Sequence, residues 1–232
     1  MPRFTTAYSD YIVRTAEVDI LVRRATKLER AAPVANTDEI RALCRAATVL
    51  LCSHLEGYVK DLGEVTVDRL YGSAVPRDRL GERFFYSISK NHFDEMRDTA
   101  DPAKLATKMF AFLDQDSHFW SRTGPFPNPV PYDRFSAGFA SPSVDKVCAF
   151  LGRFGAGNLK KDLMRTLAAD WAPVSNMVEN VVATRNSIAH GDSLVSKTPG
   201  DVAQMLIIVK QFVKAVDGAF GGWCRSNLCP IR

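Results

Sequence analysis

The sequence predicts an all-α fold, and two features of its pattern indicate this class. Apolar residues recur at helical spacing along almost the whole chain of 232 residues, whereas runs of β-branched residues with period-two alternation are absent. A hydrophobic share of 46% and a charged share of 24% are typical of a globular protein with a buried core. We therefore expect a helical bundle that forms a single domain over residues 1–232, with additional helices and a proline-rich loop at 120–142.

Two long helices are expected at the start of the chain. The first carries an apolar stripe from Tyr8 to Leu28 and ends before the turn sequence AAPVANT. The second is expected from about residue 38 to about residue 71, with Asn36 and Glu39 forming a capping box and Gly63 as the point of a break. Its centre is apolar on nearly every side, which indicates a helix in the middle of the bundle.

The middle of the chain predicts shorter helices and then the proline-rich segment. Residues 79–98 and 102–115 each have the pattern of one helix. Prolines then alternate with other residues, which favours extended backbone over helix; they are Pro125, Pro127, Pro129 and Pro131. Aromatic residues of the segment could stack on bases or dock a partner, or they could pin the loop across the bundle; they are Phe126, Tyr132, Phe135 and Phe139.

Four more helices are expected in the C-terminal part. Residues 143–154 form one, and residues 158–171 form another that Asn158 caps. The third runs from about residue 173 to about residue 190. The last begins with Thr198 as cap, a proline in its first turn and Asp201 completing a capping box.

Arg185 breaks the apolar pattern of the third of these helices. On a helical wheel it lies about 20° from Val174, in the middle of the apolar stripe, whereas Asn186 and His190 lie at about 120° and 160°. A guanidinium buried without a partner costs several kcal/mol, so Arg185 requires a counter-charge, a ligand or a second subunit. We consider Glu56 as its partner, since this acid shares a second face of the long central helix with three other residues. They are Arg45, Val49 and Cys52.

The end of this helix also has a purely structural interpretation. A histidine in the last turn is favourable at the negative end of the helix dipole, and Gly191 can provide a left-handed cap. From the pattern alone, both a structural and a chemical role of His190 remain open.

The fuller string RNSIAHG, residues 185–191, resembles the Arg-x4-6-His signature of the HEPN superfamily (higher eukaryotes and prokaryotes nucleotide-binding). The likeness extends to the order of the helices, to RAATVLLCSHLEGYVKDL at 45–62, to NLKKDL at 158–163 and to the amphipathic helix after the motif. It is closest to one of the longer bacterial branches and covers most of the chain, with residues 99–140 as the part that departs from it.

The resemblance implies a homodimer whose motif helices face each other and a metal-independent endoribonuclease, a hydrolase that serves as a toxin or in phage defence. It places Arg185 and His190 in catalytic roles and Asn186 in a supporting role, with RNA as substrate and no metal or other cofactor. An antitoxin or another component of a defence system is then an expected partner. Glu56 is added as a supporting residue from the helical wheel alone.

These side chains suit RNA cleavage chemically. RNA carries its own nucleophile, the 2′-hydroxyl, so cleavage needs a group that moves protons and a cation that holds the charge on the phosphorane oxygens. His190 suits the first task. Arg185 suits the second, because its planar guanidinium can hold two phosphate oxygens. The wheel puts the two residues about 140° apart, so a twofold axis is expected to bring each arginine near the histidine of the other subunit.

Two other functions remain as alternatives: a non-catalytic HEPN-like subunit for nucleotide binding or protein interaction, and a helical adaptor whose proline-rich loop recruits partners. His54 is expected to be packed in the core, and His92 and His118 lack the spacing of metal ligands. Basic side chains on helix faces are interpreted as solvated rather than as phosphate contacts; they are Arg23, Arg24, Lys27, Lys160, Lys161 and Arg165.

Cysteine usage and hydropathy suggest a cytoplasmic protein that is not in a membrane. The five cysteines form no Cys-x-x-Cys pair and are odd in number, which favours a reducing compartment. The first ten residues lack the pattern of a signal peptide, and the longest apolar run, AATVLLC at 46–52, is much shorter than a membrane span. A net charge of +4 is compatible with a polyanionic partner but does not indicate one.

Overall fold

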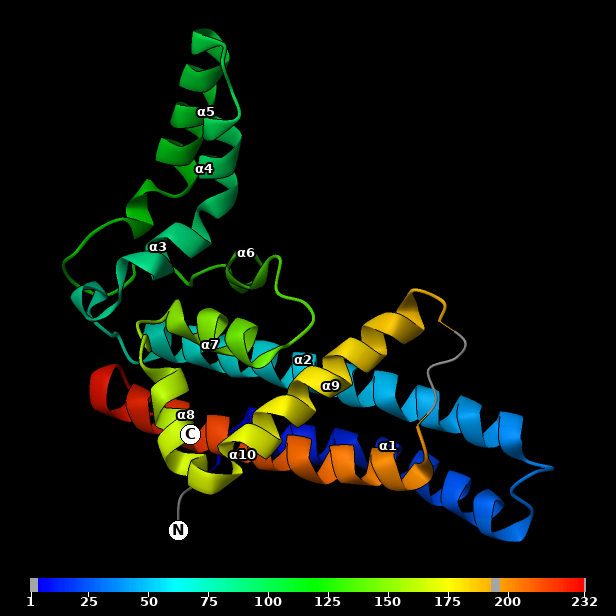
Figure 1. The fold of residues 1–232 in the computed structure, drawn as a ribbon. Helices are drawn as coiled ribbons and strands as arrows, with labels where there is room; N and C mark the ends of the chain where they lie inside the picture. The colour runs from blue at the N-terminus through cyan, green and yellow to red at the C-terminus, as the bar shows by residue number, and fades with distance from the viewer. Residues whose placement is uncertain (1–3, 193–196, 232) are drawn as a thin grey trace.

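The structure, a computed structural model, describes residues 4–192 and 197–231, and every regular element within these two ranges is helical (Figure 1). The predicted all-α class is therefore confirmed. Among the described helices, none combines the length and the hydropathy that crossing a membrane requires.

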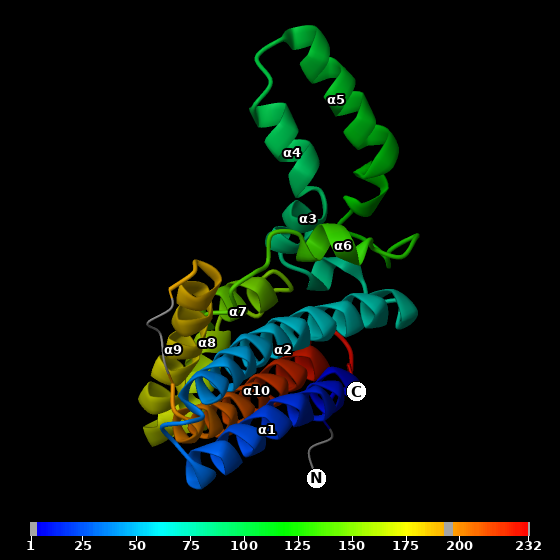
Figure 2. The same cartoon turned by 90° about the vertical axis from the view of Figure 1, so that its right-hand side faces the viewer.

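Three long helices lie side by side in the centre of the molecule: α1 (Thr6–Ala31), α2 (Thr37–Gly72) and α10 (Pro199–Asn227) (Figures 1 and 2). The helix α9 (Trp171–Ala189) packs on both α2 and α10, and α8 (Leu159–Leu167) packs on α10. As its composition predicts, α2 buries side chains along its whole length.

Helix α2 continues through Gly63 without the expected break. A Cβ atom at this position would lie 2.8 Å from Cε1 of Phe150 and 3.0 Å from the hydroxyl oxygen of Tyr132. That hydroxyl donates a hydrogen bond to the backbone carbonyl of Lys60. The glycine is thus explained by packing: it leaves room for two aromatic side chains that come from other elements.

A buried polar network joins the three central helices at one place. The backbone amide of Thr5 donates to Oδ2 of Asp217 at 3.2 Å, and the Thr5 hydroxyl donates to Oδ1. The Tyr58 hydroxyl lies 3.4 Å from the carbonyl oxygen of Val213 and 3.5 Å from Asp217 Oδ1. Burial, and then the neighbouring carboxylate, raise the pKa of Tyr58 well above its ordinary value, so its hydroxyl remains a donor.

Of the three expected N-terminal helix caps, one is confirmed, one is wrong and one is correct in position alone. At the start of α10, Thr198 N donates to Asp201 at 2.9 Å and Asp201 N donates to the Thr198 hydroxyl at 3.1 Å, which completes the predicted capping box. At α2 the capping box is absent: Asn36 Nδ2 donates to the Leu28 carbonyl at 3.1 Å, and Glu39 forms an ion pair with α1. Asn158 takes the predicted cap position of α8, but its side chain makes no capping hydrogen bond there.

The single helix predicted for residues 79–98 is divided into α3 (Glu82–Ile88) and α4 (Lys90–Arg97). Ser89 between them is 1% exposed, and its hydroxyl accepts a hydrogen bond of 2.9 Å from Nε1 of Trp120. Helix α4 pairs with α5 (Pro102–Gln115), and the two form a hairpin that stands away from the central helices (Figures 1 and 2). None of the described side chains of α4 and α5 is buried.

The proline-rich segment crosses the surface of the bundle and contains one short helix, α6 (Tyr132–Ser136), which the sequence did not predict. Phe126, Phe135 and Phe139 are 4%, 0% and 6% exposed, so these rings pack in the core and are not available to bases. Phe135 and Phe139 lie against Phe150 of the next helix, α7 (Val144–Gly152). Of the two interpretations of these phenylalanines, the structure supports the loop pinned across the bundle.

Candidate functional site

The apolar face of α9 packs inward as its periodicity predicts. Val174, Val178 and Val181 are almost completely buried, and α9 lies with this face against α2 and α10. Thr184 is buried too, and after it the burial decreases toward the end of the helix. Arg185 follows at this transition and is half-buried, which places its guanidinium at the edge of the contact with α2.

The guanidinium of Arg185 forms a hydrogen bond with the side chain of the next residue. Its Nη1 donates a hydrogen bond of 3.1 Å to the side-chain oxygen of Asn186. In the described part of the chain, no carboxylate lies within ion-pair distance of it. The thiol of Cys52 on α2 is close enough to experience its charge: burial raises the pKa of Cys52 to about 11, and Arg185 acts in the opposite direction. The site therefore contains a half-buried cation without an acidic partner among the described residues.

The end of α9 has the hydrogen bonds of a Schellman motif. His190 is the C-cap residue, and its backbone N–H donates to the Asn186 carbonyl at 2.9 Å. Gly191 has a φ of +84°, as predicted for a left-handed cap; its N–H donates to Ile188 at 3.1 Å, and the following N–H donates to Ser187 at 3.1 Å. The imidazole of His190 is exposed at this end.

Helix α2 supports the end of α9 from the side. Nη1 of Arg45 donates a hydrogen bond of 2.7 Å to the carbonyl oxygen of Asp192, directly after the motif. Arg45 and Cys52 thus both lie on the side of α2 that is turned toward the motif, as expected from their shared face on the helical wheel. This contact fixes the position of the backbone that follows His190 relative to α2.

Glu56, on the same face of α2, is not brought to Arg185. Its Oε1 accepts from Lys60 at 2.8 Å, and its Oε2 accepts from the backbone N–H of Ser141 at 3.2 Å. Within the ranges that the structure describes, no ion pair joins Glu56 and Arg185. Because Ser141 has a φ of +54°, the carboxylate stabilises an unusual turn in the loop before α7.

The other sites that the sequence suggested have local explanations. His54 is half-buried between α1 and α2, with Nε2 at 3.4 Å from Glu17 Oε2. Several basic side chains on the helix faces pair with nearby acids, as expected of solvated positions; these pairs are Arg24 with Glu39, Lys160 with Asp145, and Arg165 with Asp162. Among the described residues, no group of three or more His, Cys, Asp or Glu side chains could hold a metal ion.

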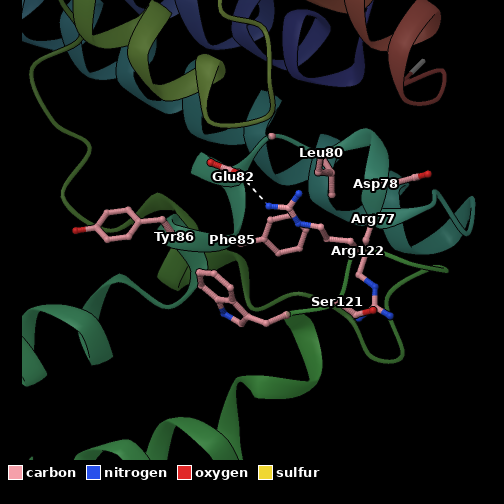
Figure 3. A pocket seen from close by; sticks show the side chains of 10 residues that line it. Arg77, Asp78, Leu80, Glu82, Phe85, Tyr86, Ser121 and Arg122 are labelled. Carbon is pink, nitrogen blue, oxygen red and sulfur yellow. Dashed lines mark hydrogen bonds and ion pairs between the residues drawn. The ribbon is translucent and has the colours of Figure 1, made fainter.

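A pocket elsewhere in the fold was not predicted from the sequence. A pocket of about 590 Å³ lies where the short helix η1 (Arg77–Arg79) and the start of α3 face the loop at residues 120–122 (Figure 3). Its walls include Phe85, Tyr86 and Trp120, and Arg122 and Glu82 lie at its rim. The aromatic residues are visible in the sequence, but only the fold brings the two segments together.

A bundle of helices in which one helix ends in an arginine, four intervening residues and a histidine is the architecture of HEPN proteins. The family model that matches this chain is described as HEPN_MAE_28990-like HEPN, and it matches residues 5–205, which include the whole motif. The chain belongs to this HEPN family, which confirms the predicted superfamily. Neither the curated proteins nor the solved structures contain a match.

Proposed function

We propose that this HEPN protein is a metal-independent endoribonuclease, with Arg185 and His190 as the catalytic residues and Asn186 as the residue that orients the arginine. The observation that supports this proposal most directly is the half-buried guanidinium of Arg185, whose charge no described carboxylate neutralises. Phosphate is the anion that a planar guanidinium binds through two parallel hydrogen bonds. The exposed imidazole of His190, at the end of the same helix, is accessible to a substrate of any length.

Each residue has one role in the proposed reaction. The 2′-hydroxyl of the substrate attacks the adjacent phosphorus, and its proton goes to a base, for which His190 is the proposed group. Arg185 stabilises the negative charge that develops on the non-bridging oxygens. The P–O5′ bond breaks and the leaving O5′ takes a proton from water, so the products are a 2′,3′-cyclic phosphate and a 5′-hydroxyl. Asn186 holds the guanidinium in one orientation through the hydrogen bond of 3.1 Å.

The proposed active site is shared between two subunits. Arg185 lies at the contact with α2, whereas His190 is exposed at the end of α9, and a second copy packed along the outer face of α9 would add its histidine to the arginine of the first. That face is polar and, among the described residues of α9, carries no large apolar side chain; its exposed residues include Asn176, Glu179, Asn180 and Ala183.

The direct test is cleavage of single-stranded RNA by the purified protein in EDTA. We expect Arg185→Ala to lower the rate by about 10²–10³-fold and His190→Ala by about 10²–10⁴-fold. His118→Ala, at an exposed histidine on η2 (Ser117–Phe119), is the matched control and should cleave as the wild type does. Equal rates in all four proteins would refute the nuclease proposal and favour the non-catalytic alternative.

Co-expression of the two inactive variants tests the shared site. If each site takes its arginine from one subunit and its histidine from the other, a mixed dimer contains one intact site, and about a quarter of the wild-type activity returns. If both residues act within one subunit, no activity returns on mixing. Growth arrest of bacteria by the wild type, but not by His190→Ala, would support the role as a toxin or defence effector.

A further inference from the structure

The pocket between η1, α3 and the loop at 120–122 has an apolar floor and a charged rim (Figure 3). Leu80 and Phe85 are 7% exposed and form part of its buried wall, and Trp120 is 40% exposed beside them. The ring centres of Phe85 and Trp120 are 5.9 Å apart. A flat, partly accessible indole on a rigid apolar base can stack on a planar ligand.

Trp120 is held in place although it is partly exposed. Its Nε1 donates to the hydroxyl of Ser89 at 2.9 Å, and its ring meets the rings of Phe93 and Phe112 at centre distances of 5.3 and 6.0 Å. Because the indole is already fixed, a ligand that stacks on it does not have to order this side chain.

The loop that carries Trp120 is also fixed, by Arg77. Its guanidinium donates to the carbonyl oxygens of His118 at 2.9 Å and Thr123 at 2.7 Å, and its backbone N–H donates to Gly124 at 2.9 Å. Arg77 is therefore occupied by structural hydrogen bonds, and Arg122 is the cation at the rim that remains available to a ligand.

Arg122 reaches across to Glu82, and the two form an ion pair of 2.9 Å (Figure 3). Their side chains are 84% and 87% exposed, and ion pairs of this kind contribute little stability. A phosphate can therefore replace Glu82 as the partner of Arg122 at little cost, and it adds a second hydrogen bond through the guanidinium. The freed carboxylate of Glu82 then returns to water or accepts from an amino group of a base.

We propose that this pocket binds one unpaired base of a single-stranded RNA and the phosphate next to it, and so holds the substrate at a distance from Arg185 and His190. This inference rests on the proposed function, which makes RNA the substrate. A ligand without a planar ring would not use Trp120, and a ligand without an anionic group would not use Arg122. An RNA strand supplies both groups at neighbouring positions.

The pocket and the motif can belong to one binding path. In both views of the fold, α3 and the end of α9 lie on the side of α2 that is opposite α1 (Figures 1 and 2). Helix α2 rises by about 1.5 Å per residue, so its end at Gly72, just before the pocket, is roughly 30 Å from Cys52, whose thiol experiences the charge of Arg185. Single-stranded nucleic acids commonly occupy sites of about 4–16 nucleotides, so one strand can reach both places.

The test is the affinity for a single-stranded 2′-O-methyl RNA of about 12 nucleotides, which cannot be cleaved because its 2′-hydroxyls are blocked. Trp120→Ala should bind it about tenfold more weakly, and Trp120→Phe, which keeps an aromatic ring, should bind it nearly as the wild type does. Arg122→Gln should bind about threefold more weakly. The logarithm of its association constant should also fall less steeply with the logarithm of the salt concentration, by about 0.7, the value for one phosphate contact of a single strand. Glu82→Gln, which releases Arg122, should bind more tightly by about twofold.

Two variants are matched controls. Arg97→Gln removes an arginine that is 69% exposed and ion-paired on α4, and Phe110→Ala removes an aromatic residue that is 66% exposed on α5. Both should bind the probe like the wild type. If Trp120→Ala and Arg122→Gln also bind like the wild type, or if the wild type does not bind the probe, the pocket proposal is overturned, even if RNA is cleaved at Arg185 and His190. If Trp120→Ala and Arg122→Gln bind the probe more weakly but the wild type cleaves no RNA, the pocket proposal stands and the nuclease proposal is refuted.

Discussion

The packing around Gly63 predicts whether alanine at this position raises or lowers the free energy of unfolding. In the middle of a helix, alanine is favoured over glycine by about 0.5–1 kcal/mol. At Gly63 the new Cβ would lie 2.8 Å from Cε1 of Phe150, which is closer than carbon atoms can approach. Overpacking of this kind costs about 1–3 kcal/mol, so Gly63→Ala should lower the free energy of unfolding by about 1 kcal/mol in total.

Gly218 in α10 is the matched control, since nothing lies within 4 Å of a Cβ placed there. Gly218→Ala should therefore raise the free energy of unfolding by about 0.5–1 kcal/mol. Urea denaturation followed by circular dichroism measures both changes, and thermal melting should shift by about 2–4 °C per kcal/mol in a domain of this size.

The contact with Phe150 can be tested separately. In a Phe150→Leu background the clash is relieved, so Gly63→Ala should cost less there than in the wild type. If Gly63→Ala were as stabilising as Gly218→Ala, the close packing of Phe150 and Tyr132 against α2 would not be the reason for the glycine.

Three further predictions concern the stability of the fold. Asp217→Ala leaves the buried amide and hydroxyl of Thr5 without this acceptor and should lower the free energy of unfolding by about 2–4 kcal/mol in urea titrations; a loss below about 0.5 kcal/mol would contradict the role of this network. Gly191→Ala forces alanine to a φ of +84° and should cost about 1–2 kcal/mol, measured by thermal melting. Burial lowers the pKa of His54, although Glu17 acts in the opposite direction, so the unfolded chain binds this proton more readily. The contribution of neutral His54 to stability is complete above the unfolded pKa of about 6.5 and is lost as the pH falls below that value. The free energy of unfolding should therefore decline less steeply with falling pH in His54→Gln, by at most about 1.4 kcal/mol per pH unit. An unchanged pH profile in His54→Gln would refute that assignment.

The features that the sequence predicted correctly depend on residues a few positions apart. The capping box of α10 involves Thr198 and Asp201 alone, and the left-handed cap at Gly191 depends on backbone geometry within one turn. The apolar stripe of α9 likewise follows from helical spacing and a single buried direction. For the candidate site, this was enough to place Arg185 on the inward face of its helix and His190 at the helix end, whereas the half-burial of Arg185 at the edge of the core is seen only in the structure.

The features that the sequence did not predict are decided by contacts between distant segments. The Asn36 side chain donates to a carbonyl of the preceding helix instead of accepting from the backbone amides of its own helix. Ser89 interrupts a helix where it meets Trp120, which is 31 residues away. Glu56 takes the amide of Ser141, which is 85 residues away, instead of the arginine. A helical wheel shows which residues share a face but not which atoms from other elements approach that face. For the same reason the aromatic pocket could not be located from sequence.

We expect the hairpin of α4 and α5 to separate from the bundle more easily than the central helices separate from one another. Because none of its described side chains is buried, separating it from the bundle exposes little apolar surface, whereas separating α2 from α10 exposes the core. Its backbone amides should therefore exchange with solvent deuterium through local openings of small free energy, while those in the centre of α2 exchange only when the whole bundle unfolds. We therefore expect two levels of cooperativity in unfolding, with the pocket at Trp120 at the boundary between them.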